Sequence, residues 1–209
     1  MEVMYFENNE LFKENSYTGV YGDKVDLVKN NVKFDGILYN DNWTVKRFLN
    51  GYKLSLDKRV EELFNEFDLN LNLLKRRVFE LSKGQYKLVL LIYSLLNNKD
   101  NIVLDYFDKC LCYKYKKKVI NYFKSKYEGN LVVISNNLVF LSELCNNLIV
   151  FRDNKLIFND KLDYIYKSNI KIEYPEITKF IKLANKRKAK LSYTVDNKEL
   201  LKDIYRSIK

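Results

Sequence analysis

Four consecutive residues, Ser82, Lys83, Gly84 and Gln85, bring a hydroxyl, an ammonium and a glycine to the expected start of a helix. Ser82 stands where a helix N-cap is expected, just before an apolar helical pattern. A serine hydroxyl, backbone N–H groups and a helix N-terminus favour an anion, and the ammonium of Lys83 could reach one. An ordinary cap before a core helix is the alternative, and these residues alone do not exclude it.

A carboxylate and two uncharged side chains follow apolar runs further along the chain. Asp105 follows the run at residues 102–104, where it could hold Mg²⁺ through water or cap a helix. Tyr106 comes next and cannot act as a carboxylate base. Asn136 follows the run at 131–134, and its amide can donate a hydrogen bond but cannot carry a proton or a charge.

A glycine-rich segment near the N-terminus resembles a damaged phosphate loop. A working loop has the pattern Gly-x-x-x-x-Gly-Lys-Ser/Thr, whose N–H groups wrap the phosphates. If Gly19 is its first glycine the loop is one residue short, and if Gly22 is, almost all of it is missing. No Ser or Thr follows Lys24, and Asp23 and Asp26 add negative charge. We expect weak or absent nucleotide binding; a strand-turn-helix that merely inherits the fold is the alternative.

The hydrophobic pattern supplies the elements that must position these groups. It predicts strands at 16–21, 37–39, 102–104, 131–134, 148–151 and 156–158, and helices at 43–49, 56–67, 86–96, 113–127, 175–187 and 196–208. The last two strands read as a hairpin with a turn at Asp153 and Asn154. Strands that alternate with helices predict a layered α/β domain with buried parallel strands.

The order of these features resembles the nucleotide-binding subunit of ABC-type ATPases. Residues 81–85 are similar to the signature motif, Asp105 to the end of the Walker B strand, and residues 134–137 to the switch segment. In that family two subunits close head to tail, and each ATP lies between the phosphate loop of one and the signature of the other. The resemblance implies a P-loop NTPase-like parallel sheet with a helical signature subdomain, here trimmed, and use of ATP and Mg²⁺.

The chain departs from this family at the hydrolytic positions. Tyr106 stands in place of the catalytic glutamate, Asn136 in place of the switch histidine, and Lys83 in place of a signature glycine. The resemblance therefore leaves no catalytic residue intact, with Asp105 as the metal ligand. Gly19, Gly22 and Lys24 would be a degenerate nucleotide loop.

The C-terminal stretch is similar to the tail of ATPases from energy-coupling factor importers of the cobalt and vitamin type. That tail is a short helical domain which contributes to dimerisation, so residues 1–168 are expected to form the degenerate nucleotide-binding domain and 169–209 a C-terminal helical dimerisation domain. The segment 168–175 reads as a linker. Ile177, Phe180, Ile181 and Ala184 are expected to form the apolar face of the first C-terminal helix; plain packing helices are the alternative.

The resemblance implies a subunit that is silent for hydrolysis at its own site. It would pair with an intact ATPase, complete that partner's ATP site through Ser82, Lys83, Gly84 and Gln85, and dock on a membrane coupling subunit at the inner face of the cell membrane. One alternative is a slow ATPase for which Lys24 and Asp105 suffice. Another is a basic, nucleic-acid-associated protein of the same fold.

The amino-acid composition narrows the classes of function and the cellular locations that remain. The 209 residues carry a formal charge of +10, contain no histidine, and include seventeen Tyr and thirteen Phe. Because a Lys- and Asn-rich balance is typical of an AT-rich genome, we favour a solvated basic surface over a nucleic-acid patch. Cys110, Cys112 and Cys145 form neither a zinc set nor a disulfide framework. With no signal sequence or membrane span in the pattern, we expect a cytoplasmic protein.

Overall fold

The computed structural model describes residues 3–6, 16–22, 32–35, 42–50, 58–97, 100–153 and 155–208. Several sequence predictions lie outside these residues: Lys24 with its neighbours Asp23 and Asp26, the strand at 37–39, and Asn154 of the hairpin turn.

A five-stranded sheet forms the centre of the molecule, with the strand order β4-β5-β2-β6-β7. The strands are β2 (Tyr17–Gly22), β4 (Asn101–Asp105), β5 (Asn130–Ile134), β6 (Asn147–Arg152) and β7 (Lys155–Lys161). The first four are parallel to their neighbours and β7 pairs antiparallel with β6. Five predicted strands are confirmed, at 16–21, 102–104, 131–134, 148–151 and 156–158, and so is the hairpin formed by β6 and β7. The apolar runs of β4, β5 and β6 are buried, as parallel strands covered on both faces require.

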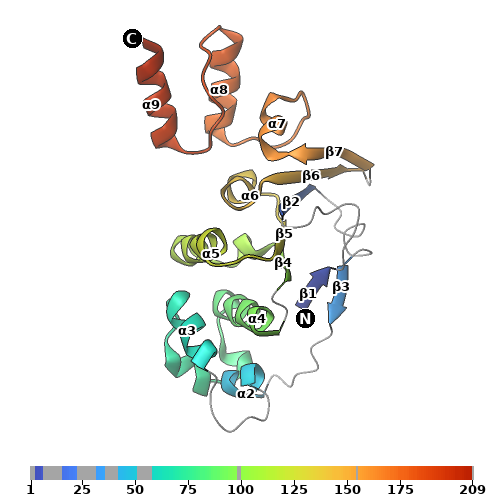
Figure 1. Cartoon of the computed structure of the whole chain (residues 1–209), viewed down its shortest axis with the longest axis vertical. Helices are drawn as coiled ribbons and strands as arrows, with labels where there is room; N and C mark the ends of the chain where they lie inside the picture. The colour runs from blue at the N-terminus through green and yellow to red at the C-terminus, as the bar shows by residue number, and fades with distance from the viewer. Residues whose placement is uncertain are drawn as a thin grey trace.

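Two further strands, β1 (Val3–Phe6) and β3 (Val32–Asp35), form an antiparallel ribbon next to β4 (Figure 1). Neither strand is predicted by the hydrophobic pattern.

Helices α4 (Lys83–Asn97), α5 (Tyr113–Ser125) and α6 (Leu138–Leu144) line one side of the sheet (Figure 1). Below them lie α2 (Val45–Asn50) and α3 (Lys58–Glu66), followed by the short 3-10 helices η1 (Leu71–Lys75) and η2 (Val78–Glu80). These elements form a helical subdomain, as the fold prediction expected.

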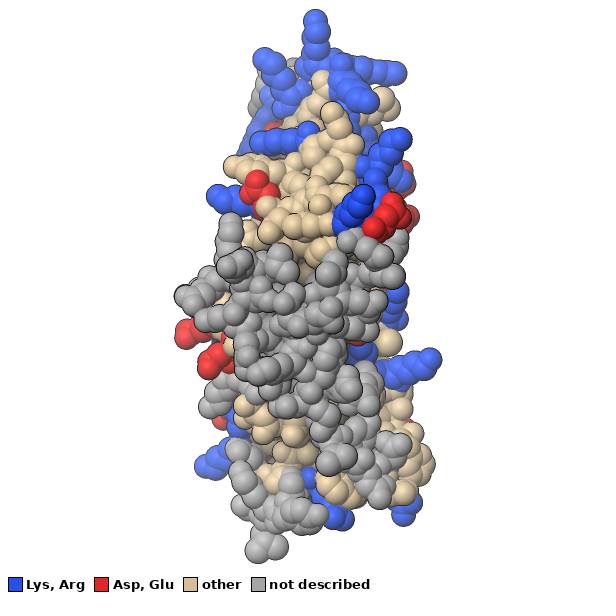
Figure 2. Space-filling view, turned by 90° about the vertical axis from the view of Figure 1, so that its right-hand side faces the viewer, with Lys and Arg blue, Asp and Glu red and all other residues tan. Residues whose placement is uncertain are grey.

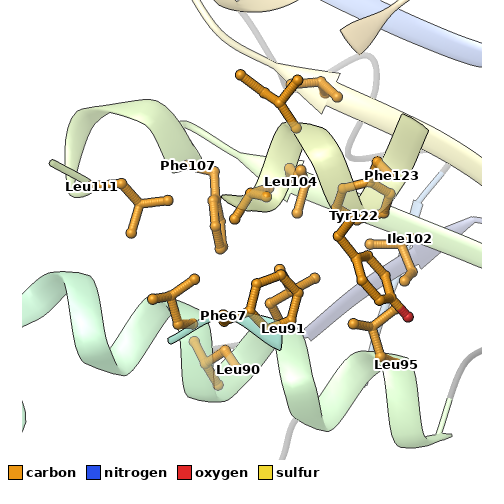
Figure 3. Packing of buried hydrophobic residues seen from close by; sticks show 14 of the residues in the cluster. Phe67, Leu90, Leu91, Leu95, Ile102, Leu104, Phe107, Leu111, Tyr122 and Phe123 are labelled. Atoms are coloured by element: carbon orange, nitrogen blue, oxygen red, sulfur yellow. The ribbon is translucent and has the colours of Figure 1, made fainter. Parts of the chain in front are cut away.

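The main core lies between α3, α4, α5 and β4. Figure 3 shows Phe67, Leu91, Leu104 and Tyr122 meeting there. The helical period of the sequence puts two sets of apolar residues on one face each of the segments 58–67 and 83–97. All of them are buried: Val60, Leu63, Phe64 and Phe67 in the first, and Leu88, Leu91, Ile92 and Leu95 in the second. The 3.6-residue period therefore located both buried helix faces correctly.

The C-terminal unit comprises α8 (Glu176–Lys186) and α9 (Asn197–Ile208), after α7 (Leu162–Lys167). It has a small core of its own, formed by Ile181, Leu191 and Leu200. The predicted inward position of Phe180 is wrong: its side chain is 50% exposed. Only a narrow side of α8 packs against the small core, so some of its apolar side chains stay exposed to solvent.

The segment 168–175 is irregular, as a linker would be, but it is packed rather than free. Tyr174 and its apolar neighbours Ile170 and Ile172 pack against the main core. The Tyr174 hydroxyl donates hydrogen bonds to the carbonyls of Ile165 and Ile170, at 2.9 and 3.0 Å. These contacts fix the start of α8 on the main domain.

Candidate functional site

The carboxyl ends of β4, β5 and β2 meet at one edge of the sheet. Ile134 is opposite Asp105 on one side and Val20 on the other. This register brings together the predicted site residues Gly22, Asp105, Tyr106 and Asn136, which are up to 114 positions apart in the sequence.

Gly22 ends β2 in a conformation that only glycine tolerates. Its φ is 132°, and a Cβ atom would lie 2.1 Å from the carbonyl oxygen of Phe151. Its N–H donates a hydrogen bond to the Asn136 Oδ1 at 3.2 Å. The glycine is therefore required by the close approach of β6, whether or not a phosphate binds beside it.

Gly19 lies inside β2, paired with Val133 and Leu148. A Cβ atom there would lie 3.1 Å from the Leu141 Cδ2. Gly19 is thus a strand residue under α6, and the interpretation in which it opens a phosphate loop is wrong. Of the two proposed registers, only the one that starts at Gly22 places its first glycine at a strand end.

Asp105 presents an unpaired carboxylate oxygen at this edge. Its Oδ1 is buried and has no hydrogen-bond partner among the residues that the structure describes. A buried carboxylate oxygen without a partner is costly, and a hydrated Mg²⁺ would satisfy it. The Asp105 carboxylate can therefore supply one of the oxygen atoms around a hydrated Mg²⁺. The described ranges contain no cluster of three or more His, Cys, Asp or Glu that could hold a metal by itself.

Lys87 and Lys109 also act at the end of β4, and both were missed from the sequence. The Lys87 Nζ donates to the Asp105 carbonyl oxygen at 2.8 Å, which joins the first turns of α4 to the strand end. The Lys109 Nζ lies 4.0 Å from the centroid of the Tyr106 ring. The one sequence signal for the contact between Lys87 and Asp105 was a lysine inside the apolar pattern of α4.

Tyr106 bridges two strand ends instead of facing a substrate as a base. Its backbone is left-handed, with φ 44° and ψ 42°, a conformation uncommon for a residue other than glycine. Its hydroxyl points at the Gly22 carbonyl oxygen, 3.5 Å away, and its N–H donates to the Ile134 carbonyl at 2.9 Å. The ring therefore lies beside the end of β2 and offers no carboxylate base there.

A buried pair, Ser135 and Asp108, supports the edge from below. The Ser135 Oγ donates to the Asp108 Oδ1 at 2.8 Å and accepts from the N–H of Asn137 at 3.0 Å. Both residues are buried. The bond ties the start of the Asn136 segment to η3 (Phe107–Lys109), just after Tyr106.

Beside Gly22 and Asn136 lies a cavity of about 320 Å³. Arg152 and Lys171 supply its positive charge and Glu173 its negative charge. The lining of the cavity therefore carries one more positive than negative charge, which favours an anionic group.

Residues Ser82 to Gln85 form a capping box at the start of α4. The Ser82 Oγ accepts from the Gln85 N–H at 3.2 Å, and the Gln85 Oε1 accepts from the Ser82 N–H at 3.1 Å. A Cβ atom on Gly84 would lie 2.8 Å from the carbonyl oxygen of Cys110, so a side chain there would clash with the backbone. The predicted N-cap is confirmed, and Ser82 and Lys83 are both exposed.

The fold matches that of ABC transporter cassettes of known structure. The structure of cbiO1 from Clostridium perfringens, part of the ABC transporter complex cbiONQ, has a TM-score of 0.59 and 14% identity, covering 89% of this chain and 96% of that one. A dimeric bacterial ABC transporter cassette has a TM-score of 0.55 and 15% identity, covering 72% and 87%.

No protein-family model matches the chain, and several curated proteins are similar to it in sequence. An ABC transporter ATP-binding protein of Methanocaldococcus jannaschii is 28% identical over 138 residues, 59% of this chain and 50% of that protein. The nickel import system ATP-binding protein NikE of Staphylococcus aureus is 26% identical over 140 residues, 61% and 60%. The matches span half to three fifths of these relatives. No helix in the described ranges has the length and apolar character needed to cross a bilayer.

Proposed function

We propose that this chain is a degenerate ATP-binding subunit of an ABC importer, of the energy-coupling factor kind, that pairs with an intact ATPase. Its main role is to complete the ATP site of that partner. The observation that carries this proposal is a contrast within one molecule: the capping box at Ser82 is intact and exposed, whereas the edge at Tyr106 lacks a base.

The signature segment would act on the partner's ATP. The N-terminus of α4 carries partial positive charge, and its first N–H groups can bind a phosphate oxygen. The Ser82 Oγ is the acceptor in its bond to Gln85, so its own proton remains available for a phosphate. Lys83 adds a mobile positive charge beside it. Together these groups would orient the terminal phosphate and stabilise charge that develops on it.

The chain's own edge would bind Mg²⁺ and ATP weakly or not at all. Asp105 would hold a metal-bound water through its unpaired Oδ1, and Mg²⁺ would supply the charge that a triphosphate needs. Tyr106 and Asn136 provide no group that takes a proton from an attacking water. We therefore propose that hydrolysis at this edge is lost.

The free Asp105 Oδ1 favours a second candidate, a slow ATPase that binds Mg-ATP at its own edge. This candidate shares the fold and the importer assignment and differs only in which site turns over.

The C-terminal residues 169–209 are proposed to contribute to dimerisation. Support comes from the likeness to cbiO1, which extends over 89% of the chain, and from the exposed apolar side chains on α8 and α9. A membrane coupling subunit would hold the pair at the inner face of the cell membrane. The transported substrate is chosen by other subunits and leaves no mark on this chain.

Measuring ATP turnover by the purified chain, beside its Lys24→Ala variant, separates the two candidates. We expect no turnover above a buffer blank for either protein. Turnover that Lys24→Ala abolishes would overturn the proposal of a silent site.

A second measurement tests the pairing. An intact ATPase subunit is expressed alone and together with this chain, and we expect higher ATP turnover from the co-expressed pair.

A further inference from the structure

We infer that the exposed face of α8 and α9 binds a different subunit with an acidic rim, and that it disfavours a second copy of this chain. The inference rests on the proposed function and adds to it the chemistry of the partner. It follows from which apolar side chains are exposed, from their position on the two helices, and from the charges around them.

Four large apolar side chains of the C-terminal unit are open to solvent. Phe180 and Leu183 on α8 are 50% and 55% exposed, and Leu201 and Tyr205 on α9 are 55% and 72% exposed. Each pair is spaced three or four residues apart, so it forms a stripe along its helix. Clustered exposure of this kind is typical of a surface that a partner covers.

The two stripes lie on the same side of the unit. Both helices run in the same direction (Figure 1), and they face each other across Ile181 and Leu200. Viewed along a helix axis, successive residues are about 100° apart. Phe180 and Leu183 are therefore displaced from Ile181 in one direction around α8. Leu201 and Tyr205 are displaced from Leu200 in the opposite direction around α9. For parallel helices that face each other, opposite turns point to a common side.

The opposite side of the unit is already occupied by its own chain. Between the helices the backbone returns as an extended segment, and the Asn185 side chain bonds both the N–H and the carbonyl of Leu191, at 2.6 and 2.8 Å. The Asp203 Oδ2 accepts from the Ser192 N–H at 2.6 Å. The return segment therefore covers that side, and the stripes on the other side have no cover among the described residues.

Positive charge surrounds the apolar stripes. Residues 169–209 hold eleven Lys and Arg against five Asp and Glu, so they carry +6 of the net charge of +10. Figure 2 shows Lys and Arg crowding the upper end of the molecule, where this unit lies. Lys186, Arg187 and Lys198 lie within three or four residues of the stripes, and none forms a salt bridge among the described residues.

This charge decides between a copy and a different partner. In a two-fold dimer the same patch meets itself, so the three cations would face a surface with the same excess of positive charge. Like charges across an interface weaken association and suppress the wrong partner. An acidic rim would remove this repulsion and speed encounter. Helices about 17 and 18 Å long offer less than the roughly 800 Å² per partner of a standard interface, so this face supplements other contacts between the subunits.

A charge-reversed form of the full chain serves as a synthetic partner. It carries Lys186→Glu, Arg187→Glu and Lys198→Glu, while its apolar stripes are unchanged. Sedimentation of the wild type, of the reversed chain and of their equal mixture, without ATP, measures the three associations. We expect the mixture to form a one-to-one complex at least ten-fold more tightly than either chain associates with itself. Raising the salt from about 50 to about 500 mM should weaken it.

Two control variants separate charge from shape. Gln at the same three positions removes the charge without reversing it, and a mixture of that variant with wild type should associate less tightly than the Glu mixture. Adding Leu201→Ser and Tyr205→Ser to the reversed chain should abolish the complex, and circular dichroism checks that α9 persists.

Three results would overturn the inference. In the first, the wild-type chain dimerises through Leu201 as tightly as the mixture associates. In the second, the mixture stays monomeric, and in the third, the wild-type chain binds duplex DNA or anionic vesicles more tightly than the reversed chain does. The Ser82 variants described in the Discussion involve no residue of this face. A failure here with an intact Ser82 effect would therefore leave the proposed function standing.

Discussion

The Gly22 N–H donates a hydrogen bond to the Asn136 Oδ1 at 3.2 Å, which joins the ends of β2 and β5 at the edge where the site residues meet. Asn136→Ala removes this acceptor, and we expect it to lower the free energy of unfolding by about 1 kcal/mol. Asn136→Asp keeps an acceptor in the same place and should preserve most of that stability. Urea unfolding measures both. Equal losses in the two variants would show that the bond contributes nothing.

Gly22 and Gly19 provide a matched pair for testing where the strand ends. Gly22→Ala places a Cβ atom 2.1 Å from the Phe151 carbonyl oxygen at a φ of 132°, so we expect a loss of about 3 kcal/mol or more. Gly19→Ala meets a flexible leucine side chain at 3.1 Å and should cost less, about 1 kcal/mol. The comparison is made by urea unfolding of both variants. A larger loss for Gly19→Ala would contradict the assignment of Gly22 as the constrained glycine.

Cys145 is predicted to be unreactive in the folded protein. It is buried beneath β2, and burial raises the pKa of its thiol well above the usual value. Cys112 is exposed and should react with Ellman's reagent at once, whereas Cys145 should react only when the chain unfolds. Rapid modification of Cys145 in the native state, detected by mass spectrometry after digestion, would contradict the buried position.

The same thiol makes stability depend on pH. Since its pKa is raised in the folded state, its contribution is fully present below the ordinary thiol pKa of about 8.5 and is lost as the pH rises through and beyond that value. Cys145→Ala should therefore show a shallower loss of stability between about pH 8 and 10 than the wild type. Parallel curves for the two proteins would exclude this linkage.

The sequence predicted the elements well where one period dominated. The apolar runs of β4, β5 and β6 and the stripes of α3 and α4 are local patterns, and each depends only on neighbouring residues. The local pattern also located β2, predicted at 16–21 and observed at Tyr17–Gly22. The glycine spacing nevertheless allowed an interpretation in which Gly19 opens a loop, and only the pairing of Gly19 with Val133, more than a hundred residues away, excludes it.

Two features of the structure, one at the candidate site and one in the C-terminal unit, could not be predicted from the sequence for related reasons. The Ser135 and Asp108 pair depends on how β5 and η3 meet in space, and a serine and an aspartate 27 positions apart carry no signal by themselves. Phe180 has the spacing of a core residue, but a small two-helix unit cannot cover every apolar side chain it presents. Periodicity shows which residues avoid water and does not show whether this chain or another one covers them.

Ser82 separates a structural cap from a contact with the partner's phosphate. Ser82→Thr keeps both the cap and the hydroxyl and should behave as wild type. Ser82→Ala loses the bond from the Gln85 N–H and should cost about 1 kcal/mol of stability.

Ser82→Asp keeps a good N-cap, so the free energy of unfolding should be nearly unchanged, but it places a negative charge next to the partner's phosphate. If the segment completes a partner's ATP site, ATP turnover by the complex with an intact ATPase should fall at least about 100-fold in Ser82→Asp. A Ser82→Asp complex that turns over like wild type would limit Ser82 to capping α4, because a cap alone is indifferent to that substitution.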